Sequence, residues 1–161
     1  THGAAGAFDL DIDTTQAIGG AITVEPRLIG NGHTLVYQFN ASIGGPASAA
    51  LNPPSAGSAV VSAVSGNKAS VTLTGIADQQ RVMVTLAGVD GGAAAFPVSM
   101  GFLVGDFNNS RTVTASDISA TKAHLNQPAS SGNFRFDVNT SGLIDQSDIG
   151  VVKQRAGQLL P

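Results

Sequence analysis

The sequence predicts a mostly β protein with a small α module. An immunoglobulin-like antiparallel β-sandwich is expected over residues 1–103, followed by two loop–helix units over residues 104–161. Up to about residue 103, apolar and polar residues alternate with the period of two that is typical of strands with one buried face. Beyond that point an acidic twelve-residue pattern occurs twice, and each copy is followed by apolar residues at helical spacing.

Several segments of the first region alternate strongly enough to predict strands. Turn-forming residues separate these segments, as at Gly30-Asn31-Gly32, Gly44-Gly45-Pro46, Gly66-Asn67 and Asp90-Gly91-Gly92. Short strands punctuated in this way are typical of an immunoglobulin-like sandwich. The apolar residues expected to face its core are Phe8, Leu10 and Ile12; Leu35, Tyr37 and Phe39; Val71 and Leu73; Val82, Val84 and Leu86; and Val98, Met100 and Phe102.

The composition narrows the classes of function. Only 12 % of the residues are charged and the net charge is −3, which gives no reason to expect a nucleic acid or an anionic membrane as partner. The chain has no cysteine, so it holds neither a disulfide nor a thiolate metal site. No stretch approaches the roughly 18 apolar residues of a membrane span. Because the chain begins at Thr1 without a signal peptide, we expect it to be the C-terminal piece of a longer protein.

The two acidic loops are the strongest functional signal. The first loop runs from Asp106 to Asp117 and the second from Asp137 to Asp148, 31 residues further along. In both, oxygen-bearing side chains occupy positions 1, 3, 5 and 12. Calcium takes six to eight oxygen ligands at roughly 2.3–2.6 Å, and a twelve-residue loop with this spacing can supply them. The sequence therefore predicts two Ca²⁺ sites, and Ser116 and Ser147 are the expected N-caps of the helices that follow.

The two copies also share Ser-Asp-Ile at positions 11 to 13 and a lysine on the following helix. Over about 58 residues this region resembles a dockerin type I domain, a small calcium-binding module made of two half-hands. The resemblance implies that Val113 and Ile144 bring the backs of the loops together in a small core. It implies one ion held by Asp106, Asn108, Ser110, Asp117 and the Thr112 carbonyl, and a second held by Asp137, Asn139, Ser141, Asp148 and the Leu143 carbonyl.

The resemblance further implies a cohesin as the protein partner. The residues at the positions that dockerins use for recognition are Ala115, Ser116 and Lys122 in the first unit and Gln146, Ser147 and Lys153 in the second. Because Ala115 and Gln146 differ, the usual two-fold similarity of the recognition surface is only partly kept. The chain's own β-sandwich is the alternative partner.

Three departures from the family pattern bear on the affinity for calcium. Position 5 is serine in both loops, so each site lacks a negative charge that the family usually supplies. Position 6 of the first loop is Arg111 rather than glycine, and a positive φ there costs about 1 kcal/mol. The second loop keeps Gly142 and adds Asp145 at position 9, where it can act through water. We expect the second site to bind more tightly, and both sites to fall in the weak extracellular class, roughly 10⁻⁴–10⁻³ M.

Other candidate sites have less support. Asp9, Asp11 and Asp13 suit the solvent face of a strand better than a third cation site. The three histidines are far apart and show no spacing typical of zinc or of a catalytic triad. No nucleophile or phosphate-binding motif occurs, so we expect no catalysis. Sugar-binding sandwiches usually present exposed aromatic rings on which a sugar stacks. Tyr37 is in phase with the core residues, so Phe96, beside Pro97, is the remaining candidate for such a ring.

The predicted function is that of a non-catalytic, calcium-binding interaction and anchoring module at the C-terminus of a larger exported bacterial protein. Weak sites fill where calcium is plentiful, which indicates an extracellular or cell-surface location. Two alternatives stay open. One is a calcium-stabilised structural brace that packs on the sandwich and binds no partner in trans. The other is a carbohydrate-binding sandwich.

Overall fold

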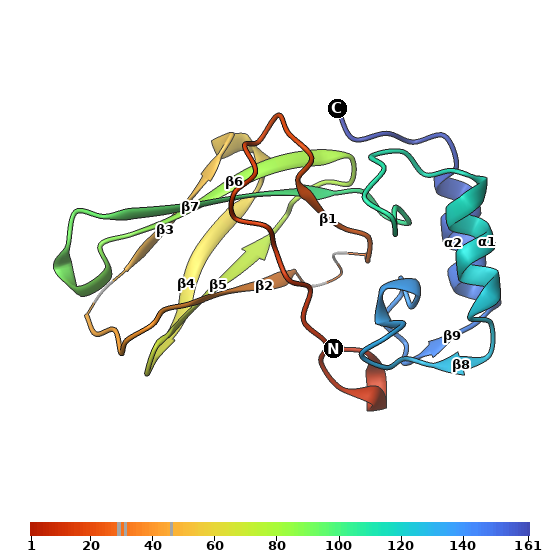
Figure 1. Ribbon diagram of the computed structural model, residues 1–161, viewed down its shortest axis with the longest axis horizontal. Coiled ribbons are helices and arrows are strands. Elements are labelled where there is room, and N and C mark those ends of the chain that lie inside the picture. Colours follow the sequence, from red (N-terminus) through yellow and green to blue (C-terminus); the bar gives the residue numbers. More distant parts are fainter. Residues whose placement is uncertain (29, 31, 46) are drawn as a thin grey trace.

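The computed structural model describes residues 1–28, 30, 32–45 and 47–161, which form two facing β-sheets with a helical module at one end (Figure 1). One sheet has the strand order β1-β7-β6-β3 and the other β2-β5-β4. The strands are β1 (Thr23–Glu25), β2 (His33–Gln38), β3 (Ser48–Asn52), β4 (Ser58–Ser65), β5 (Lys68–Thr74), β6 (Gln80–Ala87) and β7 (Ala95–Phe102). Short 3-10 turns lie at Gly3–Ala5, Pro54–Ala56 and Val89–Gly91.

This topology confirms the predicted immunoglobulin-like sandwich. Strands β3, β6 and β7 take the places of the C, F and G strands of that fold, and β2, β5 and β4 those of B, E and D. The neighbouring strands pair antiparallel except at one edge, where β1 pairs with β7 in parallel, from Thr23 opposite Met100 to Glu25 opposite Phe102. The first strand thus joins the C-F-G side.

The core between the sheets is built from the residues whose alternation predicted it. Val71, Leu73, Val82, Val84 and Leu86 are fully buried, and Val98, Met100 and Phe102 are nearly so. Tyr37 is buried as predicted, and its hydroxyl donates to the Val84 carbonyl oxygen at 3.0 Å across the two sheets. That bond satisfies the one polar atom that this ring brings into the core.

The structure differs from the prediction in the first segment and in three strands. Phe8–Asp13 alternates in exposure, with all three aspartates exposed, but it is not a strand. Its backbone bonds to side chains instead: the Asp13 N–H donates to Thr23 Oγ1, and the Phe8 carbonyl accepts from Arg27. Strands β1, β3 and β4 were not predicted. The predicted turns at 30–32 and 44–46 include Asn31 and Pro46, which lie outside the described residues.

The C-terminal module contains the two predicted helices, α1 (Ala115–Ala123) and α2 (Gln146–Arg155), which pack against each other (Figure 1). It also contains a 3-10 turn at Phe134–Phe136 and two short strands, β8 (Gln127–Pro128) and β9 (Leu143–Ile144). The predicted N-caps are wrong by two residues: Thr114 caps α1 and Asp145 caps α2. Both caps precede the serines because the helices begin at positions 10 of the loops, where the backbone turns into the helix.

The backs of the two loops do not pair with each other. Val113 and Ile144 are both buried, as expected, but each loop pairs with the segment that follows the other unit's helix. Thr112 of the first loop pairs with Leu159, beyond α2. Leu143 of the second loop pairs with Pro128, beyond α1. Both pairs are related by the same 31-residue offset, so the module has an approximate two-fold arrangement. In this arrangement the segment that leaves each helix crosses to the loop of the other unit, and we call these segments crossed exits.

A second hydrophobic core joins the module to the sandwich. It combines sandwich residues with residues of both loops and of α2; its buried members are Ile22, Val24, Leu103, Phe107, Val113, Val138, Val152 and Leu160. Backbone hydrogen bonds accompany this core: the Leu28 N–H donates to the Val138 carbonyl oxygen and the Gly105 N–H to the Pro26 carbonyl oxygen, both at 2.9 Å. The division of the chain at residues 103 and 104 stays a prediction, while packing continues across it.

No helix in the described ranges is long and apolar enough to cross a membrane.

Candidate metal centre

The first loop gathers its predicted ligands around the carboxylate of Asp106. Asp106 Oδ1 accepts from the Ser110 N–H at 3.0 Å, and the Ser110 hydroxyl lies 3.3 Å away. The same hydroxyl donates to the Thr112 carbonyl oxygen at 2.9 Å, and Asn108 Oδ1 accepts from the Ser110 N–H. At position 12, the buried Asp117 accepts from the Phe107 N–H at 3.2 Å. Position 1, 3, 5 and 7 oxygens therefore meet on one side of the loop.

The second loop repeats this geometry. Asp137 Oδ1 accepts from the Ser141 N–H at 2.9 Å, and the Ser141 hydroxyl donates to the Leu143 carbonyl oxygen at 3.0 Å. Asn139 Oδ1 accepts from the Ser141 N–H at 2.8 Å. The buried Asp148 accepts from the Asn139 N–H at 3.2 Å. The two loops differ in sequence at positions 2, 4, 6, 7, 8, 9 and 10 but adopt the same conformation. Equivalent oxygen atoms therefore gather in each loop.

The turn at position 6 explains the glycine that this position usually carries. Arg111 and Gly142 both have positive φ, +69° and +97°. Their N–H groups donate to Oδ2 of Asp106 and of Asp137, each at 2.8 Å. This bond occupies one oxygen of the position 1 carboxylate and requires the left-handed backbone that glycine adopts without strain. Arg111 makes the same hydrogen bond, but its own backbone is strained because it is not glycine.

Replacing Arg111 with glycine is expected to stabilise the first loop. The left-handed φ of +69° is unfavourable for arginine, so the substitution should raise the free energy of unfolding by about 0.5–1 kcal/mol. Guanidinium unfolding measures this change. The matched control is Gly142→Ala, which should destabilise the chain because φ is positive there and the new Cβ would lie 2.8 Å from the His2 carbonyl oxygen. A destabilised Arg111→Gly variant would contradict the assignment of strain.

The chemistry of the gathered groups fits a hard cation. Burial raises the pKa of Asp106 and of Asp148, although backbone N–H donors oppose the shift, and the neighbouring Asp117 charge raises that of Asp106 further. A cation would favour the ionised form of these carboxylates. In the described ranges, no group of three or more His, Cys, Asp and Glu side chains is placed so that it could hold a metal ion by itself. Each predicted set has two carboxylates, so neutral oxygens would complete it.

Two residues near the second loop make contacts that were not predicted from the sequence. Asp145, predicted at position 9 as a ligand through water, caps α2: its Oδ1 accepts from the Ser147 N–H at 2.7 Å and from the Ser147 hydroxyl at 2.6 Å. These bonds lower the pKa of Asp145. His2, which sequence reasoning left without a role, contacts Asp137 Oδ2 at 2.8 Å. Local sequence patterns cannot predict a contact between residues that are 135 positions apart.

The predicted partner-binding residues are accessible. Ala115, Ser116 and Lys122 on α1, and Gln146, Ser147 and Lys153 on α2, are all exposed. We call these six residues the helix-end surface. The position 11 serines touch predicted ligands: the side-chain amide of Asn139 donates to Ser147 Oγ at 2.6 Å, and that of Asn108 lies 3.5 Å from Ser116 Oγ. The helix-end surface is therefore in direct contact with both loops.

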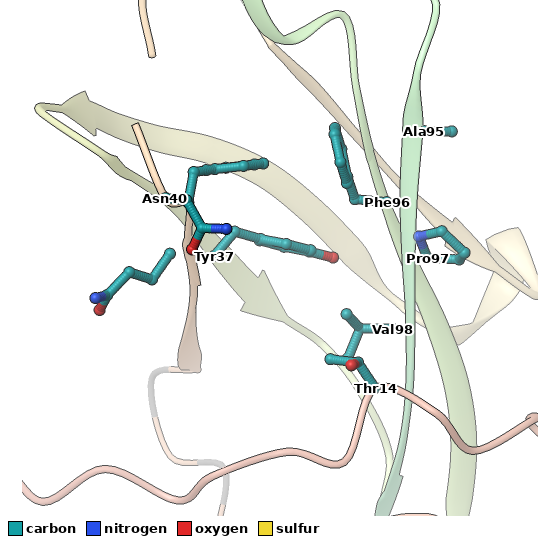
Figure 2. A pocket seen from close by; sticks show the side chains of 9 residues that line it. Thr14, Tyr37, Asn40, Ala95, Phe96, Pro97 and Val98 are labelled. Carbon is teal, nitrogen blue, oxygen red and sulfur yellow. The ribbon is translucent and has the colours of Figure 1, made fainter. Parts of the chain in front are cut away.

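The sandwich has an open groove of about 480 Å³ between β2 and β7, shown in Figure 2. Tyr37 and Phe96 stand on its opposite walls. The Phe96 ring packs edge-on against Phe39, with ring centroids 5.1 Å apart, and Tyr37 turns its hydroxyl to Val84. Phe96 is half-buried rather than exposed. Phe96 thus packs against Phe39 instead of standing alone on the surface, and carbohydrate binding stays an alternative prediction.

The fold and the loops together define the C-terminal part of the chain as a pair of EF-hand-type loop–helix units. Residues 104–155 match the family model of the dockerin type I domain, which confirms the resemblance seen in the sequence for this region of the chain. The comparison with curated proteins and the comparison with solved structures each gave no match. Dockerin type I domains are calcium-binding, non-catalytic modules of protein–protein interaction, so the match supports the predicted calcium-binding interaction module in this region of the chain.

Proposed function

We propose that this chain binds a cohesin-type protein through the helix-end surface, in a calcium-dependent manner, and that it belongs to an exported bacterial protein. The two loops would hold one Ca²⁺ each through the residues predicted from the sequence: Asp106, Asn108, Ser110, Asp117 and the Thr112 carbonyl in the first, and Asp137, Asn139, Ser141, Asp148 and the Leu143 carbonyl in the second. Each ion would supply positive charge that offsets the repulsion between the paired carboxylates.

The observation that carries this proposal is the exposure of all six residues of the helix-end surface. The module is attached to the sandwich by its other side, where Val113, Val138 and Val152 are buried with Ile22 and Leu103. Packing on the sandwich therefore leaves the surface free for a second protein. Asn108 and Asn139, at position 3 of the loops, contact the position 11 serines of the helix-end surface. A change in the loop conformation would therefore move this surface as well.

A bracing role is the second candidate, and the shared core favours it. Ile22 and Val24 of the sandwich are fully buried among residues of the module. Ion binding that orders the loops would therefore also order one end of the sandwich. The interaction role and the bracing role differ in one respect: a module that acts only as a brace binds no second protein.

The test is binding of the full chain to a panel of purified cohesins, measured by calorimetry in calcium, in magnesium and in chelator. We expect binding in calcium alone. The double variant Lys122→Glu, Lys153→Glu is expected to weaken it by roughly tenfold or more, since both lysines lie on the helix-end surface. The control is Lys68→Glu, an exposed lysine on β5 of the sandwich, which should change nothing.

Two outcomes would contradict the interaction. Binding that persists in chelator would show that the loops do not control the surface. Calcium uptake without binding to any cohesin of the panel would favour the brace.

A further inference from the structure

His2 stands out among the residues that the proposed function does not use. It is completely buried, and its Nδ1 lies 2.8 Å from Oδ2 of Asp137, the predicted position 1 ligand of the second loop. We propose that His2 is a positioning residue for the second calcium loop, holding the Asp137 carboxylate so that Oδ1 faces the ion. This inference rests on the proposed binding of calcium by that loop.

The surroundings of His2 decide which nitrogen carries the proton. Nη1 of Arg27 lies 3.0 Å from His2 Nε2. An arginine has donors only, so Nε2 must accept and Nδ1 must carry the hydrogen that it donates to Asp137. Arg27 is itself held by Glu25, with Nε and Nη2 at 2.7 and 2.6 Å from the two carboxylate oxygens. A continuous chain of hydrogen bonds thus runs from the end of β1 to the second loop.

Aromatic packing restrains the imidazole in addition to its hydrogen bonds. The rings of Phe8 and Phe134 lie 5.3 and 5.8 Å from the His2 ring, measured between centroids. The backbone approaches the loop closely as well: a Cβ on Gly3 would lie 2.2 Å from the Ser141 carbonyl oxygen. His2 and Gly3 therefore lie directly against the second loop, which gives the Asp137 carboxylate a fixed neighbour.

Among the described residues the first loop has no equivalent of His2, so it serves as an internal comparison. Asp106 Oδ2 accepts from the Arg111 N–H, and Asp137 Oδ2 accepts from the Gly142 N–H and from His2. Within the described part of the chain, the Ser110 hydroxyl, 3.3 Å from Oδ1, is the one side-chain donor group near the Asp106 carboxylate, and Oδ2 has no side-chain donor. Loss of the His2 donor should therefore weaken the second site and leave the first unchanged. Loss of a partner that orients a ligand typically costs 10–100-fold in metal affinity.

Two substitutions of His2 separate the hydrogen bond from the packing. His2→Leu keeps apolar volume and removes the donor, whereas His2→Asn places a side-chain N–H near the position of Nδ1. A calcium titration of the full chain, followed by NMR, reads each loop through its position 6 amide, Arg111 for the first and Gly142 for the second. We expect His2→Leu to weaken the second site by roughly tenfold or more and His2→Asn to restore most of it.

A second readout needs no calcium. In chelator, the Gly142 amide should exchange with solvent faster in His2→Leu than in the unmodified chain, while the Arg111 amide keeps its rate. Unchanged calcium affinity of the second site in His2→Leu, an equal loss at both sites, or failure of His2→Asn to restore binding would each overturn the positioning role. If the unmodified chain takes up no calcium, the proposed function fails with it, an outcome visible before any variant is made.

Discussion

Replacing Asp148 with alanine is expected to remove one of the two proposed calcium ions and to leave the other in place. Asp148 is buried at position 12 of the second loop, and its carboxylate accepts from the Asn139 and Asp145 N–H groups. The variant would lose a charged ligand and leave two backbone donors without a partner, each at a cost of about 1–3 kcal/mol. Calorimetric titration of chelator-treated protein with calcium, and with magnesium for comparison, measures the stoichiometry.

The mirror variant and a remote control make this result specific. Asp117→Ala should remove the other ion, because Asp117 holds position 12 of the first loop. Asp9→Ala should leave both, since Asp9 is exposed and lies outside both loops. An Asp148→Ala chain that still binds two ions would disprove the assignment of ligands. Loss of both ions would show instead that the loops are strongly coupled.

The second large effect is expected in the core that the sandwich and the C-terminal module share. Leu103 follows β7 directly and is fully buried in the second hydrophobic core, to which Ile22 and Val152 also belong. Leu103→Ala should lower the free energy of unfolding by about 2–5 kcal/mol, through lost burial and the cavity that remains. Because the core belongs to both parts, we expect both to be destabilised together.

The chain offers separate probes for its two parts. Tyr37 is the one tyrosine of a chain without tryptophan and reports on the sandwich by fluorescence, while circular dichroism of α1 and α2 reports on the module. Coincident transitions in guanidinium are expected for the unmodified protein and for Leu103→Ala. The control Val60→Ala, at a side chain that is 58 % exposed, should shift neither transition appreciably. Two separated transitions in the unmodified chain would contradict coupling through this core.

The sequence predicted the features whose signals are local. Each loop needs only twelve consecutive residues, and the φ of +69° at Arg111 follows from the turn at position 6. The strands with large alternating residues, such as Val82, Val84 and Leu86, were also predictable, because alternation directly encodes a buried face. Strands β3 and β4 were missed because alanines and serines fill much of their length, and small side chains give a weak alternation.

What the sequence did not reveal depends on contacts between distant segments. The alternation at Phe8, Leu10 and Ile12 does predict their half-buried faces, but a strand also needs a neighbouring backbone, which this segment lacks in the described structure. The parallel pairing of β1 with β7 joins residues far apart in the chain. His2 reaches Asp137 for the same reason. Periodicity reports on which face is buried, whereas it carries no information on what covers that face.

The crossed exits of the two loop–helix units are related by an approximate two-fold symmetry, which follows from the sequence repeat. Thr112 pairs with Leu159 and Leu143 with Pro128, so each repeat completes the edge of the other. This is the exchange found across the two-fold axis of a homodimer, in which the same patch of each subunit serves both sides. A single repeat cut from this chain would keep its loop and helix but leave an unpaired edge. Such a half would complete its structure by association with a second copy of itself.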